Sequence, residues 1–214
     1  IKNVLRKKPG DKIVCFDPAG FEYETELVSY GNTQAVLKVI ASAQKQTEPA
    51  IRIVLAQALP RSSKMDDIVQ KATELGASEI IPVITERTVA KGSRTERWNR
   101  ISKESAEQSG RAIVPAVRDT VSFDELLRTA EGFDLKILPW ECEESRTLKS
   151  VLSQKNELSS ILLLIGPEGG FSPSEASKAS EKGFMTVSLG KRILRTQTAG
   201  PAAMAMILYE MEMK

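Results

Sequence analysis

A glycine-rich turn is the part of the chain whose residue types point most directly to chemistry. It is Gly166-Pro167-Glu168-Gly169-Gly170, and it follows the unbroken apolar run Ile161–Ile165. Such a run is typical of a strand that is covered on both faces in a parallel sheet. Glycine permits positive φ and leaves the main chain uncovered, so a ligand can approach the backbone closely. The turn therefore predicts a cofactor site.

Two further loops are expected to lie beside this turn. Residues 190–198, which are rich in arginine and hydroxyl side chains, follow a predicted strand at 185–189. Pro139-Trp140-Glu141 follows a predicted strand at 135–138. Open α/β sheets bind ligands at the carboxyl ends of neighbouring parallel strands, so the three loops are predicted to converge on one site.

The glycine spacing and the composition exclude several other kinds of site. The turn does not fit the G-x-G-x-x-G pattern of dinucleotide folds, and the Gly-Lys-Ser/Thr of a P-loop is absent. The chain has no histidine, which excludes His-based metal sites and Ser-His or Cys-His nucleophilic pairs. Cys15 and Cys142 are too few for a disulfide framework and fit a reducing compartment. A net charge of +2 argues against nucleic-acid binding through bulk charge.

Strand and helix signals alternate from about residue 49 onward, which predicts an α/β domain with a parallel sheet. Ser172-Pro173-Ser174-Glu175 forms a capping box with proline at the first helical position, so a helix is predicted from there to Lys182. Helices are also predicted at 64–75 and 95–109, and the last helix carries an apolar stripe that packs on the sheet or meets a second subunit. Thr198 is the predicted N-cap of this last helix, because Pro201 then falls in the first turn, where its missing amide is harmless. The strands are predicted at residues 51–59, 79–84, 135–138, 161–165 and 185–189.

Residues 1–48 have a different pattern, with short predicted strands at 13–16, 21–27 and 35–40. They predict a small β-barrel, joined to the rest by a polar linker that ends at Pro49. Because the chain begins with isoleucine rather than methionine, the true N-terminus is expected to be missing. The lysines and arginine at its start either contact phosphate or form a solvated surface. No apolar run approaches the roughly 18 residues of a membrane span, and no signal peptide is visible.

Four segments resemble one known family. IGPEGGFS and LGKRILRTQTA, together with ALPRSSKMDDIVQKATELGASEIIPVITER and AEQSGR, are similar to the motifs of the ribosomal RNA small-subunit methyltransferase E family. This family lies within the SPOUT superfamily of S-adenosylmethionine-dependent RNA methyltransferases. The resemblance covers nearly the whole chain, and the motifs fall at the family's spacing.

The resemblance implies a fold and a reaction. Residues 1–48 are expected to form a PUA-like RNA-binding β-barrel that lacks its first strand and is therefore incomplete at its N-terminus. Residues 49–214 are expected to form a SPOUT methyltransferase domain, with a parallel sheet and a trefoil knot formed by the three loops. The expected reaction is methyl transfer from S-adenosyl-L-methionine to N3 of a uridine in 16S ribosomal RNA, position 1498 in the standard numbering of that RNA. The family implies a cytoplasmic homodimer that acts on the small ribosomal subunit and needs no metal.

The resemblance also implies roles for individual residues. Catalytic roles fall to Arg87, Gln108, Arg111 and Arg195. From the residues alone, Arg87 is equally well a surface arginine. Arg111 ends a charged helical stripe for which a solvated surface is the simpler interpretation, and Gln108 is implied only by the match of Glu107, Gln108 and Arg111 to the family's EQ-x-GR element. Glu168 either shapes the turn or contacts the ligand, and shaping is preferred. Cofactor contacts are implied for Leu164, Ile165, Gly166, Glu168, Gly169, Gly170, Leu189, Gly190, Arg192, Ile193, Leu194, Thr196 and Thr198.

One position departs from the family pattern, because LRTETA is usual where this chain has LRTQTA, with Gln197.

Three other functions remain as alternatives for this chain. A ribose 2′-O-methyltransferase of the same superfamily shares the glycine turn but carries Ser-Leu-Asn where this chain has Ile193 to Thr196. A uracil C5 methyltransferase requires a nucleophilic thiol, for which Cys142 is the candidate. The last is an RNA-binding module without catalysis.

Overall fold

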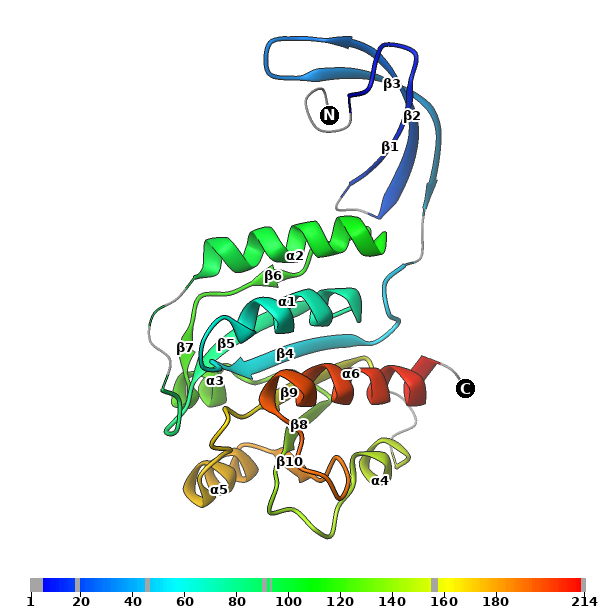
Figure 1. Ribbon diagram of the computed structural model, residues 1–214. Coiled ribbons are helices and arrows are strands. Elements are labelled where there is room, and N and C mark those ends of the chain that lie inside the picture. The colour runs from blue at the N-terminus through cyan, green and yellow to red at the C-terminus, as the bar shows by residue number, and fades with distance from the viewer. Residues whose placement is uncertain are drawn as a thin grey trace. The chain divides into compact units, whose positions relative to one another are not determined.

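The computed structural model describes residues 6–17, 20–44, 47–89, 92, 94–154 and 158–212. The chain divides into two compact units, each with its own sheet (Figure 1). The smaller unit contains residues 1–48 and 110–113, and the larger unit contains residues 49–109 and 114–214. The segment 110–113 lies outside the range predicted for the first domain.

The smaller unit is a three-stranded antiparallel sheet in the order β1-β2-β3. Its strands are β1 (Lys12–Phe16), β2 (Phe21–Tyr30) and β3 (Ala35–Gln44). They match the predicted strands, although β2 and β3 extend further than predicted, and the register between them shifts at two places. In the described part of the chain these strands form an open sheet rather than a closed barrel.

An ion pair joins the segment 110–113 to the end of this unit. The guanidinium of Arg111 contacts the carboxylate of Glu48, with Nε 3.2 Å from Oε2. The same carboxylate accepts a hydrogen bond from the Ile113 amide at 3.2 Å, and the Thr47 hydroxyl accepts one from the Ala112 amide at 3.2 Å. The local sequence carries no sign of this pairing, because its partners are more than sixty residues apart.

The larger unit has a parallel sheet in the order β10-β8-β9-β4-β5-β6, and β7 also pairs with β5. Strands β6 and β7 are only two residues long, and the sequence did not predict them. β10 ends two residues earlier than predicted. The strands are β4 (Arg52–Ala58), β5 (Glu79–Ile84), β6 (Ala116–Val117), β7 (Val121–Ser122), β8 (Leu135–Pro139), β9 (Ser160–Ile165) and β10 (Phe184–Val187).

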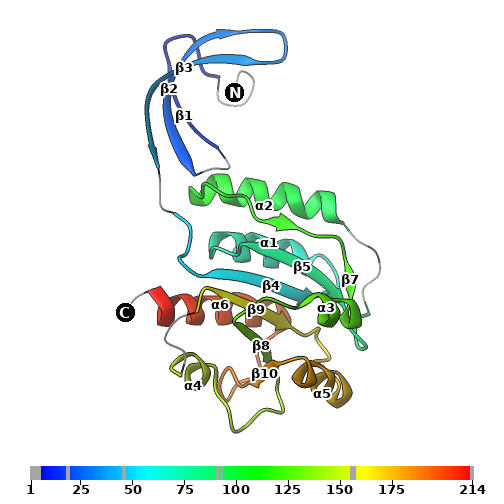
Figure 2. The ribbon, with the colours of Figure 1, turned by 180° about the vertical axis from the view of Figure 1, so that it is seen from behind.

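Helices cover both faces of this sheet, as Figures 1 and 2 show from opposite sides. Alternate residues of a strand point to opposite faces, so Leu55 of β4 belongs to one apolar core and Ala56 to the other. The first core lies under α1 (Lys64–Glu74), α2 (Thr95–Ser109), α4 (Leu148–Leu152) and α6 (Thr196–Glu212). The second lies under α3 (Phe123–Thr129) and α5 (Pro173–Glu181).

The segment between β10 and α6 pairs with the end of the loop after β8. Ser188 forms a parallel bridge with Thr147, its amide donates to the carbonyl of Arg146 at 2.8 Å, and its carbonyl accepts from Leu148 at 3.1 Å. The loop after β10 and the loop after β8 therefore lie side by side before α6 packs on β4 and β9. This is the region where the knot of SPOUT domains is expected.

Candidate active site

A cavity of about 340 Å³ opens at the carboxyl ends of β8, β9 and β10. Its walls come from the three loops that the sequence predicted would converge. Eleven of the thirteen expected cofactor residues line it, and Pro139, Trp140, Glu141, Pro167, Phe171, Ser188, Lys191 and Ala199 line it as well. The eleven are Ile165, Gly166, Glu168, Gly169, Gly170, Leu189, Gly190, Arg192, Ile193, Leu194 and Thr196.

The two remaining residues lie elsewhere. Leu164 is fully buried in the core under α3 and α5, because its side chain is on the opposite face of β9 from that of Ile165. Thr198 is exposed in the first turn of α6 and does not line the cavity. It was expected to cap this helix, but α6 already begins at Thr196, and the carbonyl of Arg195 accepts from the Thr198 and Ala199 amides at 2.8 and 2.9 Å.

The glycine turn is held by side chains from two other loops. The carboxylate of Glu168 accepts hydrogen bonds from the Arg61 amide at 3.0 Å and from Lys64 Nζ at 3.3 Å. Burial raises the pKa of Glu168, but its own amide, the Arg61 amide and the Lys64 ammonium outweigh burial and hold the pKa below the usual value. Arg87 donates from a guanidinium nitrogen to the Gly169 carbonyl at 2.7 Å. Glu168 thus shapes the turn by binding the start of α1.

A network of carboxylates fixes the loop that carries Arg87. Glu175 is 5% exposed, and its two oxygens accept from the amides of Glu86 at 2.8 Å and of Ser172 at 3.0 Å. The Ser172 hydroxyl donates to Glu86 at 2.7 Å. The predicted capping box of α5 is therefore present and also ties the loop after β5 to the glycine turn. A Cβ placed on Gly169 would lie 3.3 Å from the Cβ of Arg87, so these two loops are closely packed.

A buried hydrogen-bond chain joins the glycine turn to the start of α6. Thr196 donates from its hydroxyl to the Gly166 carbonyl at 2.6 Å and accepts from Gln57 Nε2 at 2.9 Å. Gln57 is fully buried in β4, and its Nε2 also donates to the Ala58 carbonyl at 3.0 Å. Sequence reasoning missed Gln57. The available signal was a polar residue inside an otherwise apolar strand, since such a residue needs a partner when it is buried.

The loop after β8 is organised by Glu143. One of its oxygens accepts from the Ser145 amide at 2.9 Å, the Ser145 hydroxyl at 2.6 Å and the Arg146 amide at 3.0 Å. Its other oxygen accepts from the Thr186 hydroxyl of β10 at 2.6 Å. Hydrogen bonds from the Ser145 and Thr186 hydroxyls, helped by the two amides, lower the pKa of Glu143 to about 2 against the effect of burial.

Glu143→Gln is expected to remove a contribution to stability that depends on pH. Because the folded-state pKa of about 2 lies below the ordinary value of 4.5, the carboxylate stabilises the fold above about pH 4.5, and this contribution is lost as the pH falls toward 2. The difference in free energy of unfolding between the wild type and the variant should therefore shrink over that range in urea titrations. The pKa of Asp134 is also about 2, so the variant must be compared with the wild type at each pH. A difference that does not change with pH would contradict this role.

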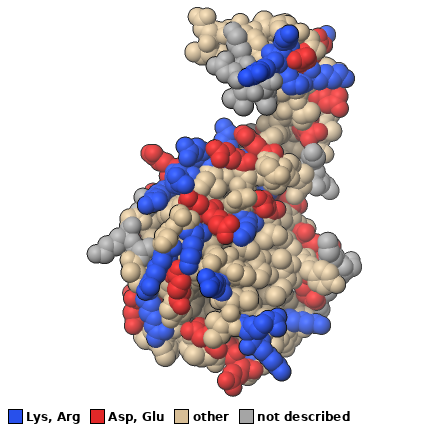
Figure 3. Space-filling model, in the orientation of Figure 1, with Lys and Arg blue, Asp and Glu red and all other residues tan. Residues whose placement is uncertain are grey.

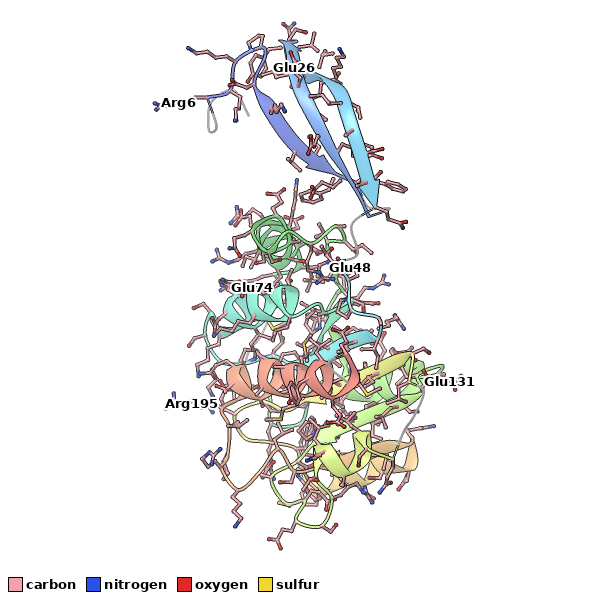
Figure 4. The ribbon with its side chains drawn as sticks, turned by 90° about the vertical axis from the view of Figure 1, so that its right-hand side faces the viewer. Arg6, Glu26, Glu48, Glu74, Glu131 and Arg195 are labelled. Atoms are coloured by element: carbon pink, nitrogen blue, oxygen red, sulfur yellow. The ribbon has the colours of Figure 1, made fainter. Side chains whose placement is uncertain are left out.

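Of the predicted catalytic residues, Arg87 lies in the loop after β5 and contacts the glycine turn, and Arg195 lies in the loop after β10, but neither residue lines the cavity. Arg195 directly precedes α6, is exposed, and lies between the cavity residues Leu194 and Thr196 (Figure 4). Arg111 belongs to the smaller unit, where it pairs with Glu48. In the face shown in Figure 3, Lys and Arg are interspersed with Asp and Glu.

Gln108 lies away from the cavity within this chain. It is exposed in the last turn of α2, and the Ser102 hydroxyl in the middle of this helix donates to the carbonyl of Pro115, just before β6. β6 pairs with the first residues of β5. The second half of α2 therefore lies toward the amino ends of the strands, whereas the cavity lies at their carboxyl ends.

Known proteins match both units. Residues 46–208 match the family model of an RNA methyltransferase domain, and residues 1–40 match that of an RNA methyltransferase PUA domain. A Bacillus subtilis protein, ribosomal RNA small subunit methyltransferase E, is 38% identical over 224 residues, which cover 100% of this chain and 87% of that protein.

Solved structures agree with these matches. The structure of a ribosomal RNA small subunit methyltransferase E from Neisseria gonorrhoeae, bound to S-adenosyl methionine, has a TM-score of 0.86 at 34% identity and covers 96% of this chain and 86% of its own. The structure of a putative methyltransferase from Legionella pneumophila, in complex with S-adenosylmethionine, has a TM-score of 0.85 at 30% identity. It covers 96% of this chain and 86% of the Legionella chain.

The fold, the cavity at its three loops and the matched domains define an RNA methyltransferase of the SPOUT type with an N-terminal PUA domain. The chain belongs to the ribosomal RNA small subunit methyltransferase E family. The predicted family and fold class are confirmed. In the described part of the chain, no group of three His, Cys, Asp or Glu could hold a metal ion, and no helix is long and apolar enough to cross a membrane.

Proposed function

We propose that this protein transfers the methyl group of S-adenosyl-L-methionine to N3 of a uridine in 16S ribosomal RNA. The observation that carries the proposal is the match to this family over the whole chain, with two of the family's motifs, IGPEGGFS and LGKRILRTQTA, on the walls of one cavity. The relatives named above include two solved with this cofactor. The substrate is expected to be the small ribosomal subunit, which implies a cytoplasmic site of action.

The cavity suits a nucleoside cofactor. Its volume of about 340 Å³ lies within the usual range for small-molecule sites, roughly 300–1,000 Å³. Apolar side chains of the loop after β10, Leu189 and Leu194, offer a surface for the adenine ring. The glycine turn offers main-chain groups for polar contacts. When bound, the cofactor supplies an electrophilic methyl group on a sulfonium.

The chain's own residues then act on the RNA base. N3 of uridine lies on the pairing edge, so the base must be unpaired or extruded before it can reach the cavity. Arg87 and Arg195 supply positive charge for the anion that forms when N3 loses its proton. No covalent intermediate with the enzyme is required. Cys142, the candidate thiol for a C5 mechanism, does not line the cavity.

A homodimer gives Gln108 a role in this site. Because Gln108 lies toward the amino ends of the strands in its own chain, it can act at the cavity only when a second copy brings it there. The exposed apolar side chains on α6, Met206 at 44% and Tyr209 at 69%, support such an interface. Arg111, as the neighbouring family residue, is proposed to act in the same setting, and its pairing with Glu48 positions it.

Gln197→Glu is expected to change the methylation rate by less than about tenfold, roughly 1.4 kcal/mol in the barrier. In the described part of the chain the buried Oε1 of Gln197 has no hydrogen-bond partner, so a carboxylate here would be buried without a donor and would favour its neutral form. Single-turnover rates at saturating cofactor measure the effect. A rise of several orders of magnitude would show that this chain lacks the base that the family's glutamate provides.

Transfer of a labelled methyl group tests the proposed function. Small ribosomal subunits from a strain without the modification should accept label from S-adenosylmethionine, whereas large subunits should not. If neither substrate accepts label, and the folded protein does not bind the cofactor, the protein would instead be an RNA-binding module without catalytic activity.

A further inference from the structure

Glu141 lies in the wall of the cavity and takes no part in the methyl transfer proposed above. Its position in the loop after β8 is fixed on both sides. On one side, the Trp140 amide donates to the Val187 carbonyl of β10 at 3.0 Å. On the other side, the Glu143 amide donates to the Trp140 carbonyl at 3.1 Å, and the Glu143 carboxylate binds β10 through Thr186. The loop therefore holds residue 141 at a set place beside the cavity.

The glycine turn makes room for this carboxylate. A Cβ placed on Gly170 would lie 2.1 Å from Oε1 of Glu141 and 2.8 Å from Oε2. Gly170 also has a φ of +65°, a conformation that disfavours side chains. Any other residue at position 170 would thus occupy the space of the Glu141 carboxylate. The contact between Glu141 and Gly170 joins the loop after β8 to the loop after β9.

In the described part of the chain, Glu141 differs from the other carboxylates around the site because no cation and no hydrogen-bond donor binds it. Glu168 binds Arg61 and Lys64, Glu143 binds the loop donors, and Glu175 binds two amides. For the residues that the structure describes, neither an ion pair nor a hydrogen bond is found at the Glu141 side chain. A carboxylate in a cavity wall has acceptor capacity for a ligand.

We propose that Glu141 binds the ribose hydroxyls of the cofactor, which extends the function proposed above and rests on it. The two oxygens of one carboxylate match the two adjacent hydroxyls of a ribose. The carboxylate lies against Gly170, and both Gly169 and Gly170 line the same cavity, so a sugar bound there would be next to the Glu141 oxygens. Dinucleotide folds use the same chemistry, with an acidic side chain that accepts from a ribose hydroxyl near a glycine turn.

Calorimetric titration of Glu141→Gln tests the assignment. The ligands are S-adenosylhomocysteine and 5′-methylthioadenosine, which has the adenine and the ribose but no amino-acid group. Both should bind at least about tenfold more weakly than to the wild type, by a similar factor, because hydrogen bonds to a charged group are strong. Glu144→Gln is the matched control, since Glu144 is an exposed carboxylate of the same loop that does not line the cavity. Thermal unfolding of both variants checks that the fold is kept.

Each result has a definite meaning. A similar loss with both ligands supports the ribose contact. A loss with S-adenosylhomocysteine alone would place Glu141 at the amino-acid end and overturn the ribose assignment, and unchanged affinity for both would overturn any contact. Failure of the wild type to bind S-adenosylhomocysteine would contradict the proposed function itself, which separates the two claims.

Discussion

Arg195→Ala is expected to lower kcat for RNA methylation by at least about a hundredfold, about 2.7 kcal/mol, with cofactor affinity changed by less than about threefold. The side chain is exposed beside cavity residues at the start of α6. We propose that this cation stabilises the uracil anion, which develops only on the way to the transition state, so the loss should fall on kcat rather than on ground-state binding. Single-turnover rates with saturating RNA, together with calorimetric cofactor affinity, separate these effects.

Two further variants make this test specific. Arg195→Lys keeps the positive charge and should recover part of the rate, although lysine lacks the planar fork of arginine. Arg128→Ala removes an exposed arginine from α3, away from the cavity, and should leave the rate unchanged. Equal losses of rate and cofactor affinity in Arg195→Ala would instead make Arg195 a residue that holds the cofactor loop.

Thr196→Val is expected to weaken cofactor binding at least about tenfold and to lower the free energy of unfolding by about 1–3 kcal/mol. Valine has nearly the same shape as threonine but removes the hydroxyl that donates to the Gly166 carbonyl and accepts from Gln57. Both partners lose a hydrogen bond, and Gln57 loses it in the fully buried interior, where this is more costly than at a surface. The two cofactor loops also lose their direct link.

Thr196→Ser is the matched control for this change. Serine keeps the hydroxyl and loses only a methyl group, so cofactor affinity should stay within about threefold of the wild type. Titration calorimetry and urea unfolding measure the two expected losses. Normal cofactor affinity in a destabilised Thr196→Val variant would limit the hydrogen-bond chain to a structural role.

Local sequence signals predicted the centre of this site correctly. The apolar strand, the glycine turn and the capping box at Ser172 and Glu175 are all present, because each depends on residues that are neighbours in the chain. The same signals placed the loops after β8 and β10 at the edge where the cavity opens. The alternation of strands and helices was sufficient to predict the parallel sheet.

The features that were missed depend on residues that are distant in the sequence. Gln57 meets Thr196 across 139 positions, and nothing local to either residue indicates the other. The pairing of Arg111 with Glu48 similarly joins the segment 110–113 to the smaller unit. α6 begins earlier than predicted, because Thr198 was expected to be its N-cap with Pro201 in the first turn, whereas the helix starts at Thr196 and has Pro201 inside it.

Mapping of the methylated nucleoside tests the central claim most directly. Small ribosomal subunits that lack the modification are incubated with the protein and S-adenosylmethionine, and nuclease fragments of the 16S RNA are analysed by mass spectrometry. The expected result is one additional methyl group, on the base of a single uridine, that elutes as N3-methyluridine after digestion to nucleosides. A methyl group on the ribose or on C5, or label distributed over many sites, would contradict the account.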